Sequence, residues 1–192
     1  MCITHILNVH HTHIVKLKSA EAPPTFPLVI DQTSNLLGVV ALAVADRMEN
    51  SAREILKHAG ETPAALVVIG YDLGPTNDQL RRVLGLSHSG TVRLVDRLVA
   101  DGLVKRRAGN DKREIALYAT RRGKALREQI LKERLGAIRP LLDPLTGKEQ
   151  ENLTELLHKI LSSMETTDLE RRSLCRLCDN RVCKNCPIPA DF

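Results

Sequence analysis

Residues 76–117 decide the fold of this chain; their sequence is TNDQLRRVLGLSHSGTVRLVDRLVADGLVKRRAGNDKREIAL. The stretch opens with a capping box, since Thr76 and Gln79 are spaced so that each side chain can satisfy a backbone amide at the start of a helix. Residues 85–87 then form a tight turn that ends in Ser87, a residue type that favours the start of a second helix. Helix, three-residue turn and helix are the pattern of a helix-turn-helix.

The second helix is predicted over about residues 88–100 and has two different faces. The apolar positions, which recur at helical spacing and are expected to face the core, are Val92, Val95, Leu98 and Val99. On the opposite face, Arg93 and Arg97 stand four residues apart and therefore on one side of the helix. A basic outer face on the second helix is typical of a helix that binds nucleic acid.

Two short strand-like runs follow the second helix. They cover residues 102–107 and 114–117, and Gly109 and Asn110 provide a polar turn between them. Such an arrangement predicts a β-hairpin, which would form a wing beside the two helices.

The order and spacing of these segments resemble the MarR family of winged-helix transcriptional regulators. The resemblance is carried by LSHSGTVRLVDRL at residues 86–98, by DGLV at 101–104 and by TRRG at 120–123. The hairpin positions that match the family's wing motif are Arg107, Asp111 and Arg113. The likeness extends over about residues 34–165. The chain departs from the family pattern at Val92, where many members have a small hydroxyl residue, and at Ala119, where a large aliphatic residue is usual.

The resemblance implies a mainly α fold with a small β wing, in which helices from both ends of the chain form a dimer. A homodimer of this type would bind double-stranded DNA at a pseudo-palindromic operator. The second helix would enter the major groove, and the wing would reach the adjacent minor groove. The implied function is transcriptional regulation, as a repressor, with a small organic effector bound between the dimer helices and the DNA-reading lobe.

Side chains from the second helix and the wing are expected to contact DNA. They are Ser87, His88, Ser89, Thr91, Arg93 and Arg97 in the helix, and Arg107, Asp111 and Arg113 in the wing. Either helix arginine can bridge a guanine edge or pair with a phosphate, and the sequence leaves that assignment open. The resemblance places Arg113 in the minor groove. Asp111 lies on the same face of the hairpin and could orient that guanidinium.

The charge distribution supports this interpretation. The 192 residues carry a net charge of +5, but residues 76–127 alone hold 13 Lys and Arg against 5 Asp and Glu, so the rest of the chain is slightly acidic. The basic excess is concentrated in the segment that would meet phosphate groups.

Helices are also predicted on both sides of the DNA-reading lobe, which spans about residues 62–118. Apolar residues recur at steps of three and four over about 34–58 and 121–164. These segments have more apolar surface than a small winged domain needs, and paired half-sites on DNA require a two-fold dimer, so we assign them to dimerisation. The chain is accordingly divided into a disordered arm at 1–30, a winged-helix domain at 31–167 and a cysteine-rich tail at 168–192.

Four of the five cysteines form a compact motif, C-x2-C-x4-C-x2-C, made by Cys175, Cys178, Cys183 and Cys186. Paired CxxC units in a protein otherwise suited to a reducing compartment favour metal ligation over disulfides. Zinc takes four sulfurs in a closed tetrahedral site. An iron–sulfur cluster also takes four, and a proline directly after the last cysteine occurs in bacterial ferredoxin motifs. Both remain open, with iron–sulfur favoured because zinc-binding pairs are usually further apart.

The sequence also indicates what this chain does not do. It contains no nucleophile with a matched base, no glycine-rich phosphate loop and no HExxH motif, so we do not expect an enzyme. No apolar run approaches the ~18 residues needed to cross a membrane, and a cytoplasmic location without membrane contact is expected. Two alternatives remain: a metal or redox-sensing protein whose winged fold serves protein contacts, and an RNA-binding winged module.

Overall fold

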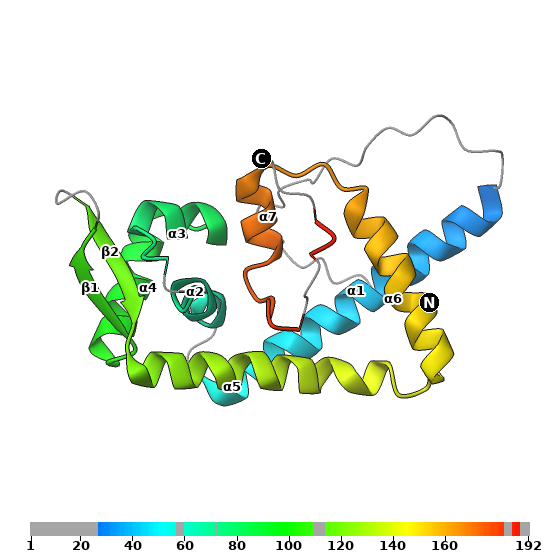
Figure 1. Cartoon of the computed structure of the whole chain (residues 1–192), viewed down its shortest axis with the longest axis horizontal. Coiled ribbons are helices and arrows are strands. Elements are labelled where there is room, and N and C mark those ends of the chain that lie inside the picture. The colour runs from blue at the N-terminus through cyan, green and yellow to red at the C-terminus, as the bar shows by residue number, and fades with distance from the viewer. Residues whose placement is uncertain (1–26, 57–59, 72, 110–113, 183–185, 189–192) are drawn as a thin grey trace, which may run out of the picture.

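The computed structural model describes residues 27–56, 60–71, 73–109, 114–182 and 186–188, with side chains from residue 31 onward. The elements in chain order are α1 (Pro27–Ile55), α2 (Thr62–Ile69), α3 (Asn77–Leu84), α4 (His88–Ala100), β1 (Val104–Ala108), β2 (Ile115–Ala119), α5 (Arg121–Ile138), the short 3-10 helix η1 (Arg139–Leu141), α6 (Gly147–Ser162) and α7 (Asp168–Leu174). The predicted fold class, mainly helical with a two-stranded wing, is confirmed (Figure 1).

The winged unit, made by α2, α3, α4 and the β1–β2 hairpin, occupies one end of the molecule (Figure 1). Helix α5 leaves the hairpin and runs along the length of the molecule, and α1 packs mainly against it. Helix α6 and the first turns of α1 lie at the other end (Figure 1). Of the segments that were assigned to dimerisation, α6 and the first turns of α1 therefore lie away from the hairpin, whereas α5 also packs against α2 and β2 of the winged unit.

The core of the winged unit is built from aliphatic side chains, as the low aromatic content of the sequence requires. Its largest fully buried members are Leu66, Ile69, Leu80, Leu98, Leu117 and Leu131. They come from α2, α3, α4, β2 and α5, so one core joins the helix-turn-helix to the hairpin and to the long helix α5. Burial of each such side chain stabilises the fold by roughly 1.5–3 kcal/mol.

The turn between α3 and α4 follows from local chemistry. Thr76 and Gln79 form both bonds of the predicted capping box at the start of α3. Gly85 ends that helix with φ of 65°, a left-handed conformation that glycine adopts without steric cost. The Ser87 hydroxyl then accepts a hydrogen bond from the Gly90 amide and starts α4.

Helix α1 begins earlier than the sequence indicated. Its first residue is Pro27, so residues 27–30, which were predicted to belong to the disordered arm, are helical. A proline suits the first turn because helices leave the amides of that turn unpaired. The rest of the predicted arm lies outside the described residues. None of the described helices combines the length and hydropathy that crossing a membrane requires.

The segment after α6, which includes the predicted cysteine-rich tail, begins with a short helix. Thr167 and Glu170 form a capping box that starts α7, and α7 packs against α3 of the winged unit. The Ser173 hydroxyl donates a hydrogen bond to the Val83 carbonyl over 2.8 Å. The tail therefore lies against the winged unit rather than beside α6, as Figure 1 also shows.

Candidate nucleic-acid interface

The outer face of α4 presents polar and basic side chains at its start and along one side. Ser87, His88 and Ser89 are exposed in the turn and first residues of the helix. Arg93 and Arg97 are exposed further along, and within the described part of the chain neither forms an ion pair. Both guanidinium groups are therefore available to phosphates or to base edges.

Thr91 does not share this face, although the sequence placed it with the DNA contacts. Its side chain is only 1% exposed, and its hydroxyl donates to the Ser87 carbonyl over 3.0 Å. Thr91 therefore stabilises the first turn of α4 from the side of the helix that faces the core. We therefore leave Thr91 out of the interface.

The hairpin is fixed beside α4 by its own ladder and by one ion pair. Its strands are antiparallel, with Val104 opposite Ala119 and Ala108 opposite Ile115. Arg106 of β1 pairs with Asp96 on the outer side of α4 at 2.5 Å. An exposed pair of this kind contributes little to stability.

Of the wing residues predicted to meet DNA, only Arg107 is described. It is exposed, and its guanidinium lies 6.0 Å from the centre of the Tyr118 ring across the hairpin. The ring supports the arginine by a cation–π contact and keeps it on the outer face. Asp111 and Arg113 lie outside the described residues, so their roles stay predictions.

Two supports of the hairpin were not anticipated from the sequence. The backbone at Pro75 accepts a hydrogen bond from the Leu117 amide over 3.0 Å, so the segment before α3 pairs with β2. On the other side, the Thr120 hydroxyl donates to the Gly102 carbonyl over 2.7 Å and also caps α5. In both contacts the two partners are far apart in the sequence and meet only after the winged unit has folded.

Buried Arg127 is a further residue that the sequence did not single out. It comes from α5, is 7% exposed, and lies 4.7 Å from the centre of the Tyr71 ring. The Tyr71 hydroxyl in turn donates to the Cys178 carbonyl, and Arg181 in the tail pairs with Glu128 of α5. The tail is thus fastened to α5 and to the segment that follows α2.

The described cysteines of the C-terminal motif gather around one pocket. Cys175, Cys178 and Cys186 line it, whereas Cys183 lies outside the described residues. Burial, and then the neighbouring Cys186 and Cys178, raise the pKa of the Cys175 thiol to about 11, so without a cation it stays protonated at neutral pH. Among the described residues, no cluster of three or more His, Cys, Asp or Glu has the geometry to hold a metal ion.

A capped second helix with a basic outer face, a short turn before it and a hairpin beside it define a winged helix-turn-helix protein. The sequence model of the MarR family matches residues 62–114, which include α2, α3, α4 and β1. The resemblance noted in the sequence is thereby confirmed for the winged unit, which is similar to the MarR family over these residues. The C-terminal cysteine motif has no part in this match.

Solved structures show the same fold. Wild-type MarR from E. coli in its apo form is 27% identical with a TM-score of 0.56, over 67% of this chain and 96% of that chain. MepR, a transcription regulator of the Staphylococcus aureus multidrug efflux pump MepA, is 19% identical with a TM-score of 0.59, over 68% and 96%. A mutant of E. coli MarR complexed with operator DNA is 27% identical with a TM-score of 0.51, over 69% and 95%. No curated protein sequence matches the chain.

Proposed function

We propose that this protein is a sequence-specific, double-stranded DNA-binding transcriptional regulator that acts as a homodimeric repressor. The observation that carries the proposal is the outer face of α4, where exposed Arg93 and Arg97 form no ion pair within the described chain and stand beside a hairpin that exposes Arg107. The likeness to an E. coli MarR mutant solved with operator DNA supports the same conclusion.

In the proposed mode of binding, α4 lies in the major groove with its N-terminal residues at the bases. Amides at a helix start and the hydroxyls of Ser87 and Ser89 suit phosphate contacts, which position the protein. Arginine suits the paired acceptors of guanine, which specify sequence. The wing would follow the neighbouring backbone, with Arg113 in the minor groove and Asp111 orienting it.

Replacing Arg93 or Arg97 of α4 should show whether that arginine reads a base or contacts a phosphate. We expect Arg93→Gln or Arg97→Gln to weaken binding to a duplex selected from a random library by about 1–3 kcal/mol when the residue reads a base. The base-reading variant should also lose preference at one operator position, whereas a phosphate contact should weaken all sequences alike. Fluorescence anisotropy with the selected duplex and with single-base variants measures both.

The matched control is Arg139→Gln, because Arg139 is exposed on η1, far from α4 along the chain. It should bind as the unaltered protein does. If both α4 variants behave like this control, α4 is not the reading helix. Competition with double-stranded RNA tests the alternative, since the deep, narrow major groove of A-form RNA does not admit a helix.

Homodimerisation is proposed from the apolar surfaces of α1 and α6. The exposed large apolar residues on these helices are Leu36, Leu37, Val39, Val40 and Leu42 on α1 and Leu156, Leu157 and Ile160 on α6. Both sets lie at the end of the molecule opposite the hairpin (Figure 1). Large apolar side chains exposed on neighbouring turns of a helix suit an interaction surface, and a second copy would bring two winged units onto one operator.

A negative charge introduced on the apolar surface of α6 should therefore convert the dimer to a monomer. We expect Leu156→Glu to abolish dimerisation at micromolar concentration, because a carboxylate buried in an apolar interface is strongly unfavourable. Sedimentation equilibrium gives the mass directly. Val182→Glu serves as the control, since Val182 is exposed in the tail. Leu156→Glu that remains a dimer would assign the interface elsewhere.

The second proposed function is metal-dependent or redox-dependent control through the four-cysteine motif. It is favoured by the gathering of Cys175, Cys178 and Cys186 around one pocket against the winged unit. Four thiolates suit either an iron–sulfur cluster or zinc. An occupied site would act on α3 through the Ser173–Val83 hydrogen bond and on α5 through the Arg181–Glu128 ion pair.

Anaerobic purification followed by metal and sulfide analysis tests this second function. We expect one site per chain, containing iron with sulfide or zinc alone, and loss of the metal in Cys186→Ser. Ser173→Ala is the control, because it removes a tail contact and leaves every thiol in place. Full metal content in Cys186→Ser, or none in the unaltered protein, would end the metal proposal.

A further inference from the structure

Arg127 occupies a position of α5 where the pattern of the helix predicts an apolar side chain. The buried positions of α5 are Gly123, Arg127, Ile130 and Leu131, which lie on the face of the helix that meets the core. Arg127 is only 7% exposed, and a buried guanidinium is strongly unfavourable unless other groups pair with it and accept its hydrogen bonds. The partners of this side chain therefore indicate what it does.

The C-terminal end of α2, in the winged unit, provides two of these partners. The Nε atom of Arg127 donates to the Val67 carbonyl over 3.4 Å, and the guanidinium lies 4.7 Å from the centre of the Tyr71 ring. The Tyr71 amide donates to the Val68 carbonyl, so Arg127 bonds to a carbonyl that the end of the helix leaves available. The helix dipole also favours a cation at this end of α2.

Gly70 makes room for Arg127 beside α2. A Cβ atom at Gly70 would lie 2.2 Å from the Cδ atom of Arg127 and 2.9 Å from its Nε atom. The backbone at Gly70 has φ of −72° and is right-handed, which every residue type can adopt. The glycine is therefore needed for space and not for its conformation, and it allows the guanidinium to reach the end of α2.

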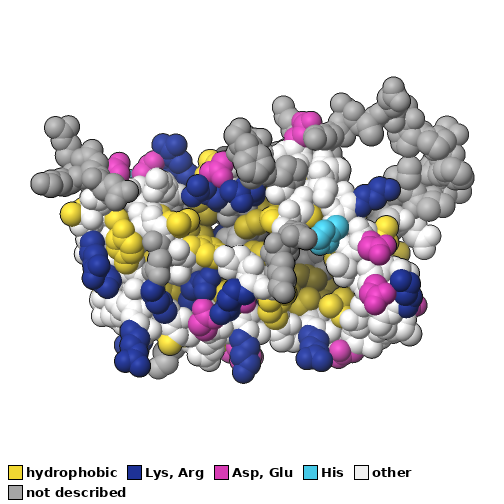
Figure 2. Space-filling view, viewed as in Figure 1, with side chains coloured by type: hydrophobic (Ala, Val, Ile, Leu, Met, Phe, Trp, Pro, Cys, Tyr) yellow, Lys and Arg dark blue, Asp and Glu magenta, His cyan; other side chains and the backbone are white. Residues whose placement is uncertain are grey.

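The C-terminal tail extends the contacts of Arg127 on the other side. Glu128, which pairs with Arg127 at 2.8 Å, also pairs with Arg181 of the tail at 2.5 Å. Arg181 pairs in turn with Asp179 at 2.8 Å, and Asp179 is 7% exposed. Two arginines and two carboxylates thus balance one another across the boundary between α5 and the tail. Figure 2 shows basic and acidic side chains next to one another near the middle of the molecule.

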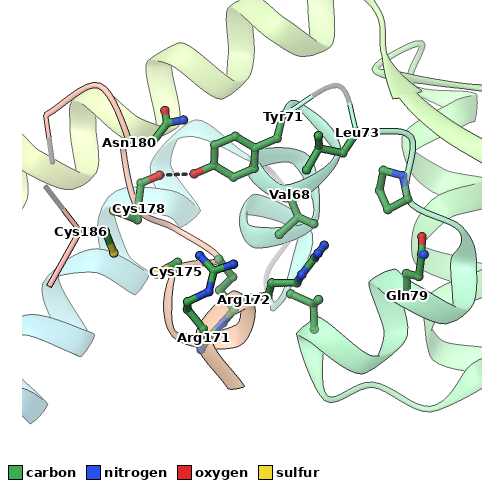
Figure 3. A pocket seen from close by; sticks show the side chains of 13 residues that line it. Val68, Tyr71, Leu73, Gln79, Arg171, Arg172, Cys175, Cys178, Asn180 and Cys186 are labelled. Carbon is green, nitrogen blue, oxygen red and sulfur yellow. Dashed lines mark hydrogen bonds between the residues drawn. The ribbon is translucent and has the colours of Figure 1, made fainter. Parts of the chain in front are cut away.

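The Tyr71 side chain joins these contacts to the tail a second time. Its ring lies against Arg127, and its hydroxyl donates to the Cys178 carbonyl, the bond that is drawn as a dashed line in Figure 3. Apolar packing between α2 and α5 has no preferred direction, whereas hydrogen bonds require a defined geometry. A rotation of α2 about α5 would therefore break several of these bonds together.

We propose that Arg127 is a positioning residue for DNA binding, which holds the winged unit at one angle to α5. Because α5 leads through η1 to α6, where a second copy is proposed to bind, a fixed angle would set the separation of the two copies of α4. The inference rests on the function proposed above. No thiol takes part in these contacts, so the inference is separate from the metal proposal.

Duplexes that differ only in the distance between their half-sites test the positioning role. Each added base pair moves one half-site by about 3.4 Å and rotates it by about 35°. We expect the unaltered protein to bind one spacing at least about tenfold more tightly than its neighbours, and Arg127→Met to reduce this ratio below about threefold. Lys132→Met, at an exposed position of the same helix, should keep the full ratio.

The ratio separates positioning from stability, because a variant that had only lost stability would weaken binding to every spacing alike. Gly70→Ala is a second variant, which should displace Arg127 while leaving its charge in place, and it should relax the preference in the same way. Gly136→Ala is its control, because nothing lies within 4 Å of a Cβ atom there. A full spacing preference in Arg127→Met or in Gly70→Ala would overturn the proposal.

Hydrogen–deuterium exchange tests the same contacts without DNA. In Arg127→Met, the amides of residues 175–182 should exchange at least about tenfold faster than in the unaltered protein, and those of α4 should keep their rates. Unchanged exchange in the tail would show that Arg127 does not hold it and would overturn the proposal. Failure of the unaltered protein to bind any duplex would refute the proposed function, and the exchange rates alone would then decide whether Arg127 fixes the tail against α5.

Discussion

Raising the salt concentration from about 50 to about 200 mM should weaken operator binding by roughly a thousandfold. The expectation follows from counterion release: the logarithm of affinity falls with the logarithm of salt at about 0.9 per phosphate contact on duplex DNA. Residues 76–127 carry 13 Lys and Arg against 5 Asp and Glu. If each subunit of a dimer makes about three phosphate contacts, six contacts give a loss of this size.

The slope of the logarithm of affinity against the logarithm of salt concentration can be divided among particular arginines. Arg107→Gln should reduce it by about one contact per subunit, because Arg107 is exposed on the wing and supported by Tyr118. Arg139→Gln should leave the slope unchanged. The measurement is a series of anisotropy titrations between these two salt concentrations. Affinity that stays flat across the series would contradict DNA binding by this surface.

Gly123→Ala should destabilise the fold by about 3 kcal/mol, the upper part of the usual range for overpacking. A Cβ atom at this position would lie 2.0 Å from the carbonyl oxygen of Leu103. That oxygen cannot move freely, since it accepts the Thr120 amide over 2.9 Å. The clash therefore involves two backbone segments, where α5 starts beside the strand that leaves α4.

Gly136→Ala is the matched control in the same helix. Nothing lies within 4 Å of a Cβ atom at Gly136, so alanine should stabilise the protein by roughly 0.5–1 kcal/mol through its higher helix propensity. Urea denaturation followed by circular dichroism gives both free energies of unfolding. Substitutions that shift stability by the same amount would show that the Gly123 contact does not constrain the junction.

The winged unit could be predicted from the sequence because its signals are local. The Thr76–Gln79 capping box, the left-handed Gly85 and the Ser87 cap each act within a few residues, and the structure has all of them. The burial of Thr91 was missed although its position indicated it. Thr91 stands four and seven residues before Val95 and Leu98, and therefore on the apolar face, but its hydroxyl beside a polar helix start was interpreted as a DNA contact.

The tail was predicted only in part, for a different reason. Thr167 and Glu170 have the spacing of a capping box in the sequence. The segment was nevertheless interpreted only as a metal-binding tail, because of its cysteine motif. Its packing depends on contacts such as the hydrogen bond from Tyr71 to the Cys178 carbonyl, which joins residues 107 positions apart. No local pattern encodes such a contact, so the pocket between tail and winged unit emerges only in the structure.

Because α5 is one continuous helix, the number of residues in it sets the direction in which the winged unit faces. The helix has 18 residues, and each residue turns it by about 100° and lengthens it by about 1.5 Å. One inserted residue beyond Gly123 would therefore rotate the hairpin and α4 by more than a quarter turn relative to α6. Seven residues, close to two whole turns, would nearly restore the orientation and extend the arm by about 10 Å. Related chains should accordingly change the length of this helix in steps of whole turns, each step matched by a wider separation of the sites on DNA.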